Sequence, residues 1–304
     1  MEQLIATTLR TATPIALVAL GGVIAWRAGI FHLGLEGLMV IGAFFAVAGT
    51  VATGEVILGV LCAIVACCVT SAIFWVVIVP LRANAIIAGL GLSIIGVGAT
   101  SYLLPVLYGK RGILEVEQGL WRPITGVQQG IAGALSELSI LVWLVPAIVL
   151  AVWVLVRRTS WGLRLAAVGE HPFAARSAGV DPGRMRLAAL LLCGVFCALG
   201  GAALALGSIV AFRENMTEGR GYIAFTAVIF GGGGPIGAAL ASLFFGLADA
   251  VGIQTQLFAK DLPIPSQFVL MLPYVLTVIA VLVSGLAAGG RSRDPGAFGE
   301  LRDG

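Results

Sequence analysis

The sequence predicts an all-α polytopic membrane protein, and three observations support this fold class. Of its 304 residues, 59% are hydrophobic and only 11% are charged, whereas a typical soluble domain has about 25% charged residues. The mean hydropathy is +1.05. Apolar runs approaching or exceeding the roughly 20 residues needed to cross a bilayer recur along the chain. We therefore expect one transmembrane domain over residues 1–304, in contact with membrane lipid.

Composition also excludes several other classes of protein. The net charge of +3 is small, and the arginines fall near the ends of apolar runs, so we expect no nucleic-acid partner. The five cysteines and two histidines lack the spacing of a disulfide framework or a metal site. The first apolar run lacks the features of a cleavable signal peptide. It is therefore expected to remain as a membrane span.

Five apolar runs precede the most basic loop of the chain, and each is expected to cross the membrane. Charge places the N-terminus outside, because the loops that contain Arg27 and Arg82 then fall inside, as the positive-inside rule requires. The mixed-charge loop 108–137 is expected at the outer face. The five runs cover residues 11–25, 38–51, 56–79, 85–106 and 138–156.

Glu36 is the first candidate functional residue. It lies at the edge of the second apolar run, where a carboxylate is costly, and an ionisable residue inside a membrane indicates a functional site by default. The alternative is an interfacial position in which Glu36 pairs with Arg27 or with a helix N-terminus. The sequence leaves both interpretations open.

The basic loop 157–186 is the longest polar interruption rich in one sign of charge. Only Glu170 and Asp181 oppose its arginines, which predicts a cytoplasmic loop. Within it, Pro172 and Gly179 delimit a short helix over 172–178. That helix is either a docking element for a partner or part of a solvated connector. The arginines are Arg157, Arg158, Arg164, Arg176, Arg184 and Arg186.

After the sixth run (187–212), the segment 213–235 predicts a broken or re-entrant helix. Its apolar part, 223–230, is too short to span and lies between glycine clusters. Irregular backbone at membrane depth is tolerated where it lines a cavity or is buried in protein. Residues 219–237 are thus either a wall of the solute path or a buried glycine-rich turn. Runs 236–251 and 267–286 follow, giving roughly eight to nine crossings in total.

The glycine cluster is not a phosphate-binding loop. Such a loop needs Gly-(x)4-Gly-Lys-Ser/Thr, and the only lysines are Lys110 and Lys260. Neither of them follows that pattern. This chain is therefore not expected to bind or hydrolyse ATP by that route.

The basic loop resembles the coupling loop of permease subunits in bacterial ABC importers of the branched-chain amino acid/ribose/nucleoside type. The pattern is Gly-Leu-Arg-(x)4-Gly-Glu-His-Pro-(x)-Ala-Ala-(x)3-Gly-Val, followed later by Met-Thr-Glu-Gly-(x)-Gly-Tyr at 216–222. His32 and His171 stand where the family usually has asparagine. The loop positions that match the family are Gly169, Glu170, Pro172, Ala174, Ala175 and Gly179.

The resemblance implies the permease subunit of an ATP-driven importer in a bacterial inner membrane, nearest to the nucleoside or simple-sugar branch. It implies a separate ATPase that binds the ATP and docks on residues 172–179, a second permease (the same or a related chain), and an extracytoplasmic solute-binding protein. No cofactor is expected on this chain. The alternative is a secondary transporter driven by an ion gradient, with Glu36 and Asp249 as its candidates. The expected path residues are Glu36, Gly219, Gly221, Tyr222, Gly231 and Gly234.

Overall fold

The computed structural model describes residues 2–123 and 138–258, together with the isolated positions 133, 136, 275 and 278. Apart from two short strands, its elements are helices. In chain order they are α1 (Glu2–Arg27), α2 (Leu35–Thr53), α3 (Val56–Ile78), α4 (Ala85–Tyr108), β1 (Ile113–Glu115), α6 (Ile140–Arg158), α7 (Ser160–Glu170), α8 (Pro172–Ser177), α9 (Pro182–Ala202), the π-helix η1 (Ala203–Ile209), β2 (Ala211–Arg213), α10 (Arg220–Phe230) and α11 (Pro235–Phe258).

Seven stretches of helix in the described residues are long and apolar enough to cross a membrane. They are α1, α2, α3, α4, α6, the continuous α9–η1 unit and α11, so the predicted all-α polytopic class is confirmed. Five of them precede α7, as the sequence predicts. Helix α10 has 11 residues and is too short to span. The predicted run 267–286 lies outside the described residues, apart from positions 275 and 278.

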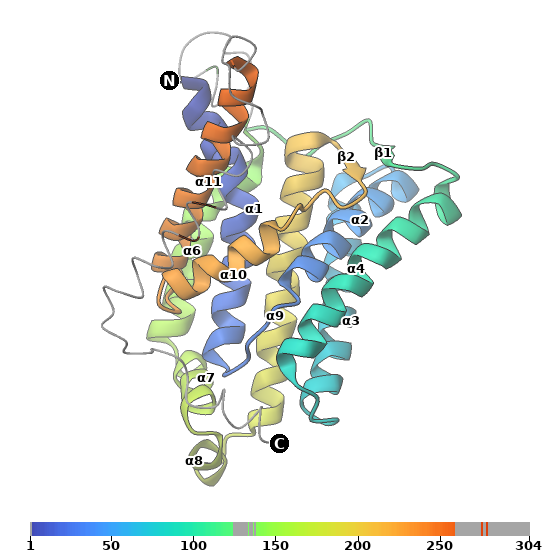
Figure 1. The fold of residues 1–304 in the computed structure, drawn as a ribbon. Helices are drawn as coiled ribbons and strands as arrows, with labels where there is room; N and C mark the ends of the chain where they lie inside the picture. The colour runs from blue at the N-terminus through green and yellow to red at the C-terminus, as the bar shows by residue number, and fades with distance from the viewer. Residues whose placement is uncertain are drawn as a thin grey trace.

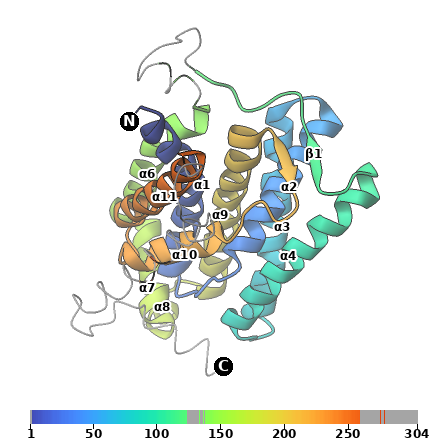
Figure 2. The same ribbon diagram turned by 45° about the horizontal axis from the view of Figure 1, so that its top comes forward.

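The helices form one bundle around α1 and α9. Helix α1 packs against α9, α10 and α11, and α9 also packs against α2 and α3. Helices α1, α6 and α11 lie on one side of α9, and α2, α3 and α4 lie on the other (Figures 1 and 2). The N-terminus is at the end of the bundle opposite α7 and α8 (Figure 1).

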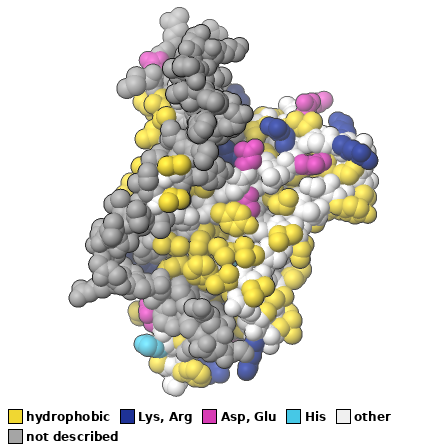
Figure 3. Space-filling model, in the orientation of Figure 1, with side chains coloured by type: hydrophobic (Ala, Val, Ile, Leu, Met, Phe, Trp, Pro, Cys, Tyr) yellow, Lys and Arg dark blue, Asp and Glu magenta, His cyan; other side chains and the backbone are white. Residues whose placement is uncertain are grey.

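The exposed surface is apolar along the middle of the bundle and charged towards its ends, as a membrane requires. Helices α3, α4 and α6 present apolar side chains outward, with Ile57, Ile94 and Leu150 among them. Figure 3 shows hydrophobic side chains over the middle of one face, with the visible Lys and Arg side chains towards its two ends. The outward apolar side chains fit contact with lipid or with another membrane subunit.

Close helix contacts depend on glycine at the seam between α2 and α4. A Cβ at Gly96 would lie 2.9 Å from the Gly37 Cα, and a Cβ at Gly37 would lie 2.5 Å from the Leu92 carbonyl oxygen. The atoms that a Cβ would meet belong to the backbone, which cannot rotate aside as a flexible side chain can. The seam therefore has the small-residue packing that the glycine content indicates.

Two helices begin inside the bundle instead of at its ends. After α1 ends at Arg27, residues 28–34 turn back and α2 begins partway along the bundle (Figure 1). Helix α10 also lies at this middle level and runs across the other helices (Figure 1). Helix α10 is the interruption predicted for 213–235, and the turn at residues 28–34 separates the predicted runs 11–25 and 38–51.

The basic loop 157–186 contains more helix than its sequence predicts. The helix expected over 172–178 is α8, but residues 160–170 also form a helix, α7. Thr159 caps α7 through a bond from the Gly162 N–H to its hydroxyl oxygen (3.2 Å). At the other end of the loop, the Asp181 carboxylate accepts bonds from the Gly183 and Arg184 N–H groups (2.9 and 3.3 Å) and caps α9.

At the opposite end of the bundle, the loop after α4 is fixed across the end of α9–η1. Strands β1 and β2 pair antiparallel with Leu114 opposite Phe212. The chain then continues along η1 through bonds from the Val116 N–H to the Val210 carbonyl (3.2 Å) and from the Leu120 N–H to the Leu206 carbonyl (2.9 Å). The sequence predicts this region as a mixed-charge loop at the outer face, without the strand pairing or the bonds along η1.

Candidate functional site

The first candidate site is the junction of α2 and α10, where Glu36 is buried with 3% of its surface exposed. Its carboxylate accepts three hydrogen bonds from the chain at the start of α10. One comes from the Thr217 hydroxyl (2.5 Å), and two come from the N–H groups of Gly219 (3.0 Å) and Gly221 (2.7 Å). Glu36 also lies in the first turn of α2. One negative group therefore stabilises the positive ends of two helices.

The glycines make this junction possible. Gly219 caps α10 with φ +83°, a conformation that favours glycine. A Cβ at Gly221 would lie 2.4 Å from the Glu36 Cα and 2.5 Å from its backbone nitrogen. Only a residue without a side chain lets α10 approach α2 closely enough for the Gly221 N–H to reach the Glu36 carboxylate.

A second charged contact connects the same end of α10 to α11. An Arg220 guanidinium nitrogen lies 3.1 Å from a carboxylate oxygen of Asp249, and these side chains are 17% and 26% exposed. Arg220 also donates a hydrogen bond to the Met216 carbonyl (3.3 Å). The start of α10 is thus held by a carboxylate from α2 on one side and by one from α11 on the other.

The geometry of this junction bears on the two interpretations of Glu36, a carboxylate inside the membrane or one paired with Arg27 or a helix N-terminus. Its partner is a helix N-terminus, as one alternative predicted, and Arg27 instead donates a hydrogen bond to the Gly233 carbonyl (3.1 Å). The depth of Glu36 within the bundle agrees with the other alternative, in which it lies at membrane level. Its three hydrogen bonds show that Glu36 holds α2 and α10 together.

The predicted path residues do not form one cluster. Glu36, Gly219 and Gly221 meet at the junction, and Tyr222 follows on α10 with 39% of its surface exposed. Gly231 and Gly234 lie in the turn between α10 and α11, at the other end of α10, about 16 Å away for an 11-residue helix.

The glycines of that turn serve close packing. A Cβ at Gly231 would lie 2.2 Å from the Ala238 nitrogen of α11, and Gly233, with φ +64°, lies against the Trp26 ring. The Gly234 N–H donates to the Gly231 carbonyl (3.2 Å). Gly233 is buried, Gly231 and Gly234 are partly buried and Gly232 is exposed, so the turn packs closely against its neighbours without being fully buried.

The second candidate site is the α7–α8 projection at the end of the bundle opposite the N-terminus (Figure 1). Glu170, Ala174 and Gly179 are exposed there, whereas Pro172 and Ala175 are buried. Gly169 is also buried, and a Cβ on it would lie 2.2 Å from the Arg27 carbonyl oxygen. The six matching loop positions therefore divide into surface residues and residues that hold the loop together.

Sequence reasoning missed the most prominent apolar residue of this projection. Phe173 on α8 exposes 74% of its surface. The available signal was a large apolar residue between Pro172 and Ala174 in a loop that is otherwise rich in arginine. An exposed aromatic side chain on a short projecting helix has the form of an anchor for a partner's pocket.

Neither site has the composition of a catalytic or metal centre. Among the described residues, no group of three or more His, Cys, Asp or Glu side chains is placed to hold a metal ion. At the junction, the Glu36 carboxylate is bonded to α10 and Asp249 is paired with Arg220. The arrangement can hold helices together and transmit movement between them.

Comparison with known proteins identifies the family. The family model described as "Branched-chain amino acid transport system / permease component" matches residues 4–282. The guanosine ABC transporter permease protein NupQ of Bacillus subtilis (strain 168) is 33% identical over 92% of this chain and 91% of its own. The nucleoside ABC transporter permease protein NupC of Lactococcus lactis subsp. cremoris (strain MG1363) is 33% identical, with 92% of each chain covered.

A third relative is named for a sugar. The putative glucose ABC transporter permease protein TsgC13 of Haloferax volcanii is 31% identical over 83% of this chain and 78% of its own. No solved structure matches significantly. The family model and the two relatives above each extend over most of this chain. The chain therefore belongs to the family of branched-chain amino acid transport system permease components.

Proposed function

We propose that this chain is the membrane-spanning permease subunit of an ATP-driven importer that carries nucleosides across a bacterial inner membrane. The observation that carries the proposal is the 33% identity to two nucleoside permeases over 92% of the chain. Simple sugars are the second candidate solute, because a relative named for glucose matches at 31% identity over a smaller share of the chain.

The α7–α8 projection is the proposed docking site for the ATPase subunit, which would bind the ATP. The exposed Phe173 ring supplies an apolar anchor, and the exposed Ala174 beside it allows close approach. Buried Pro172 and Ala175 fix α8 to the rest of the chain. Gly169 packs α7 against the end of α1, which gives a direct route for movement from the docking helix into the bundle.

The α2–α10 junction is the proposed moving part of the solute path. Two helices that begin inside the bundle meet there, which is the arrangement in which irregular backbone lines a transport pathway. The half-exposed Tyr222 is the best-placed side chain on α10 to face a solute. Gly231 and Gly234 act in this proposal by letting α10 turn sharply into α11.

Three further partners complete the proposed complex. An importer of this class needs a second permease, either the same or a related chain, to enclose a path between two bundles. An extracytoplasmic solute-binding protein delivers the solute at the end opposite α8, and lipid covers the remaining apolar surface. This chain contributes no cofactor of its own.

The ion-driven alternative is not favoured. Secondary transporters place ionisable residues where a coupling ion can bind and leave. The two candidates for that role are Glu36 and Asp249, and each is bonded to another part of the chain. The relatives are permeases of ABC transporters.

The solute is tested by competition. Cells that lack their own nucleoside uptake would express this chain with its cognate ATPase, second permease and solute-binding protein, and uptake of radiolabelled guanosine would be measured. We expect unlabelled nucleosides at about a hundredfold excess to suppress uptake more than tenfold, and glucose and ribose to leave it unchanged. Cells without this chain are the control. Absence of guanosine uptake together with uptake of a labelled sugar would transfer the proposal to sugars.

A further inference from the structure

A hollow of about 300 Å³ lies at the end of the bundle opposite α8, between the last turn of α2 and the chain that follows β1. It is open to the outside, and its lining residues in the described part of the chain are neutral or acidic. Those residues are Thr50, Val51, Gly54, Glu115, Val116, Glu117 and Gln118.

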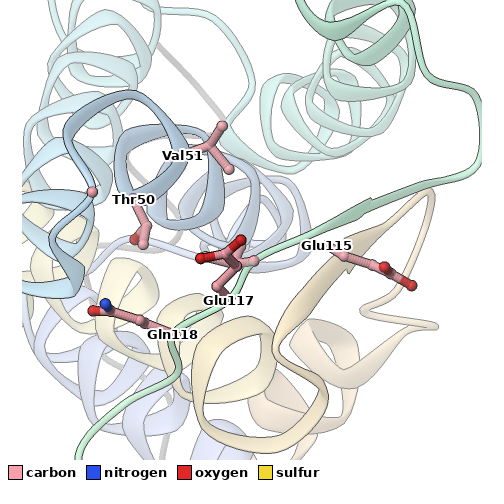
Figure 4. Close-up of a pocket in the computed structure, with 7 residues that line it drawn as sticks. Thr50, Val51, Glu115, Glu117 and Gln118 are labelled. Atoms are coloured by element: carbon pink, nitrogen blue, oxygen red, sulfur yellow. The ribbon is translucent and has the colours of Figure 1, made fainter.

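The side chains around this hollow differ in direction. Figure 4 shows the Glu117 carboxylate in the middle of the group, on the side of Thr50 and Val51, while the Gln118 side chain extends away from Glu117 below Thr50. Glu115 extends away from them on the other side of the strand (Figure 4). Neither Glu117 nor Gln118 uses its side chain in a hydrogen bond to another residue of the described part of the chain.

Two features of the hollow favour a cation, while Glu117 also lines a neighbouring hollow together with Arg122. The C-terminus of α2 ends at Gly54, whose N–H bonds to the Thr50 carbonyl (2.8 Å), and the last turn of α2 contains no basic residue. The remaining terminal carbonyls of a helix carry the negative end of its dipole and favour a cation. The Glu117 carboxylate adds a full negative charge at the same place.

The wall that carries Glu117 is held in position before any partner arrives. On one side, β1 pairs with β2. On the other, the N–H groups of Val116 and Leu120 bond to carbonyls at the end of α9–η1. A preformed wall lowers the ordering cost of binding.

We propose that this hollow receives a lysine or arginine side chain of the extracytoplasmic solute-binding protein, a proposal that rests on the proposed function. An ammonium or guanidinium group carries several N–H donors, which match the Glu117 carboxylate, the Gln118 amide oxygen and the carbonyls at the end of α2. A bound Ca²⁺ needs six to eight oxygen ligands, but only one carboxylate is directed to this place. Uncharged nucleosides and sugars bring no cation to it.

The test is a binding measurement with a matched pair of charge reversals. The permease would be purified in nanodiscs with its ATPase, and the Kd of the solute-loaded binding protein would be measured at low and high salt. Glu117→Lys places like charges together and should weaken binding at least about tenfold and reduce its salt dependence. Glu115→Lys, which reverses a charge two residues away on a side chain that points elsewhere, should change the Kd by less than about twofold.

The other possible results distinguish a failure of this inference from a failure of the proposed importer function. Equal effects of Glu117→Lys and Glu115→Lys would mean a diffuse field with no specific pocket, and no effect of Glu117→Lys would mean no basic side chain there. Either result overturns the inference, while co-purified ATPase leaves the proposed function standing. If wild type binds neither ATPase nor binding protein, the proposed function itself fails. Thermal unfolding of each variant confirms that its fold is intact.

Discussion

Gly221→Ala is expected to abolish transport, because the new Cβ would collide with the backbone of α2. It would lie 2.4 Å from the Glu36 Cα, and backbone cannot move aside as the end of a flexible side chain can. Helix α10 must then separate from α2 and lose its bonds to the Glu36 carboxylate. The measurement is uptake of labelled solute together with the thermal unfolding temperature, and we expect uptake at background level and a lower unfolding temperature.

A matched substitution distinguishes this collision from a general effect of alanine at a glycine position. Gly98→Ala changes a glycine inside α4 whose Cβ would meet no atom within 4 Å, and alanine favours helix over glycine by roughly 1 kcal/mol. Uptake should therefore persist with equal or higher stability. Glu36→Ala should reproduce the loss, because it leaves two buried donors, the Thr217 hydroxyl and the Gly221 N–H, unpaired at about 1–3 kcal/mol each, together with the partly buried Gly219 N–H. Normal uptake by Gly221→Ala would refute the role of the junction.

Phe173→Asp is expected to release the ATPase from the permease while the permease stays folded in the membrane. The change removes an apolar anchor that is 74% exposed and brings a charge into the docking pocket, where an unpaired charge costs about 3–5 kcal/mol. The measurement is the amount of ATPase that co-purifies with the tagged chain. We expect a loss of at least about tenfold.

The controls for this prediction come from the same loop and from the far end of the molecule. Ala174→Asp, also on the surface, should act like Phe173→Asp, whereas Ala175→Asp buries a charge under α8 and should lower the amount of folded permease. Trp121→Asp changes an exposed aromatic residue (67%) near the end opposite α8 and should leave the ATPase bound. Retention of ATPase by Phe173→Asp would remove Phe173 from the docking surface.

The sequence was sufficient to predict the existence of the seven spans that the structure describes, because hydropathy and length are local properties, but α1 begins at Glu2, nine residues before the predicted run 11–25. Runs such as 56–79 and 85–106 correspond to α3 and α4 with boundaries within two residues. The interruption at 213–235 was also predictable, since its apolar part is too short to span and lies between glycine clusters.

The partner of Glu36 was beyond the reach of sequence reasoning, because Thr217 lies 181 residues away. Helix α7 was missed for a related reason. Its sequence is only weakly apolar, and it is held by contacts that Gly162 makes with the end of α6 and Gly169 makes with the end of α1. The hollow at Glu117 likewise exists only because the β1 loop crosses the end of α2.

The energy source is the central claim, and uptake by proteoliposomes tests it most directly. The vesicles would contain this chain, its second permease and the ATPase, with ATP inside and the binding protein loaded with labelled nucleoside outside. We predict uptake that requires hydrolysable ATP and continues when ionophores remove all ion gradients. Uptake that needs no ATP and stops when the ionophores are added would contradict the account and support an ion-driven transporter.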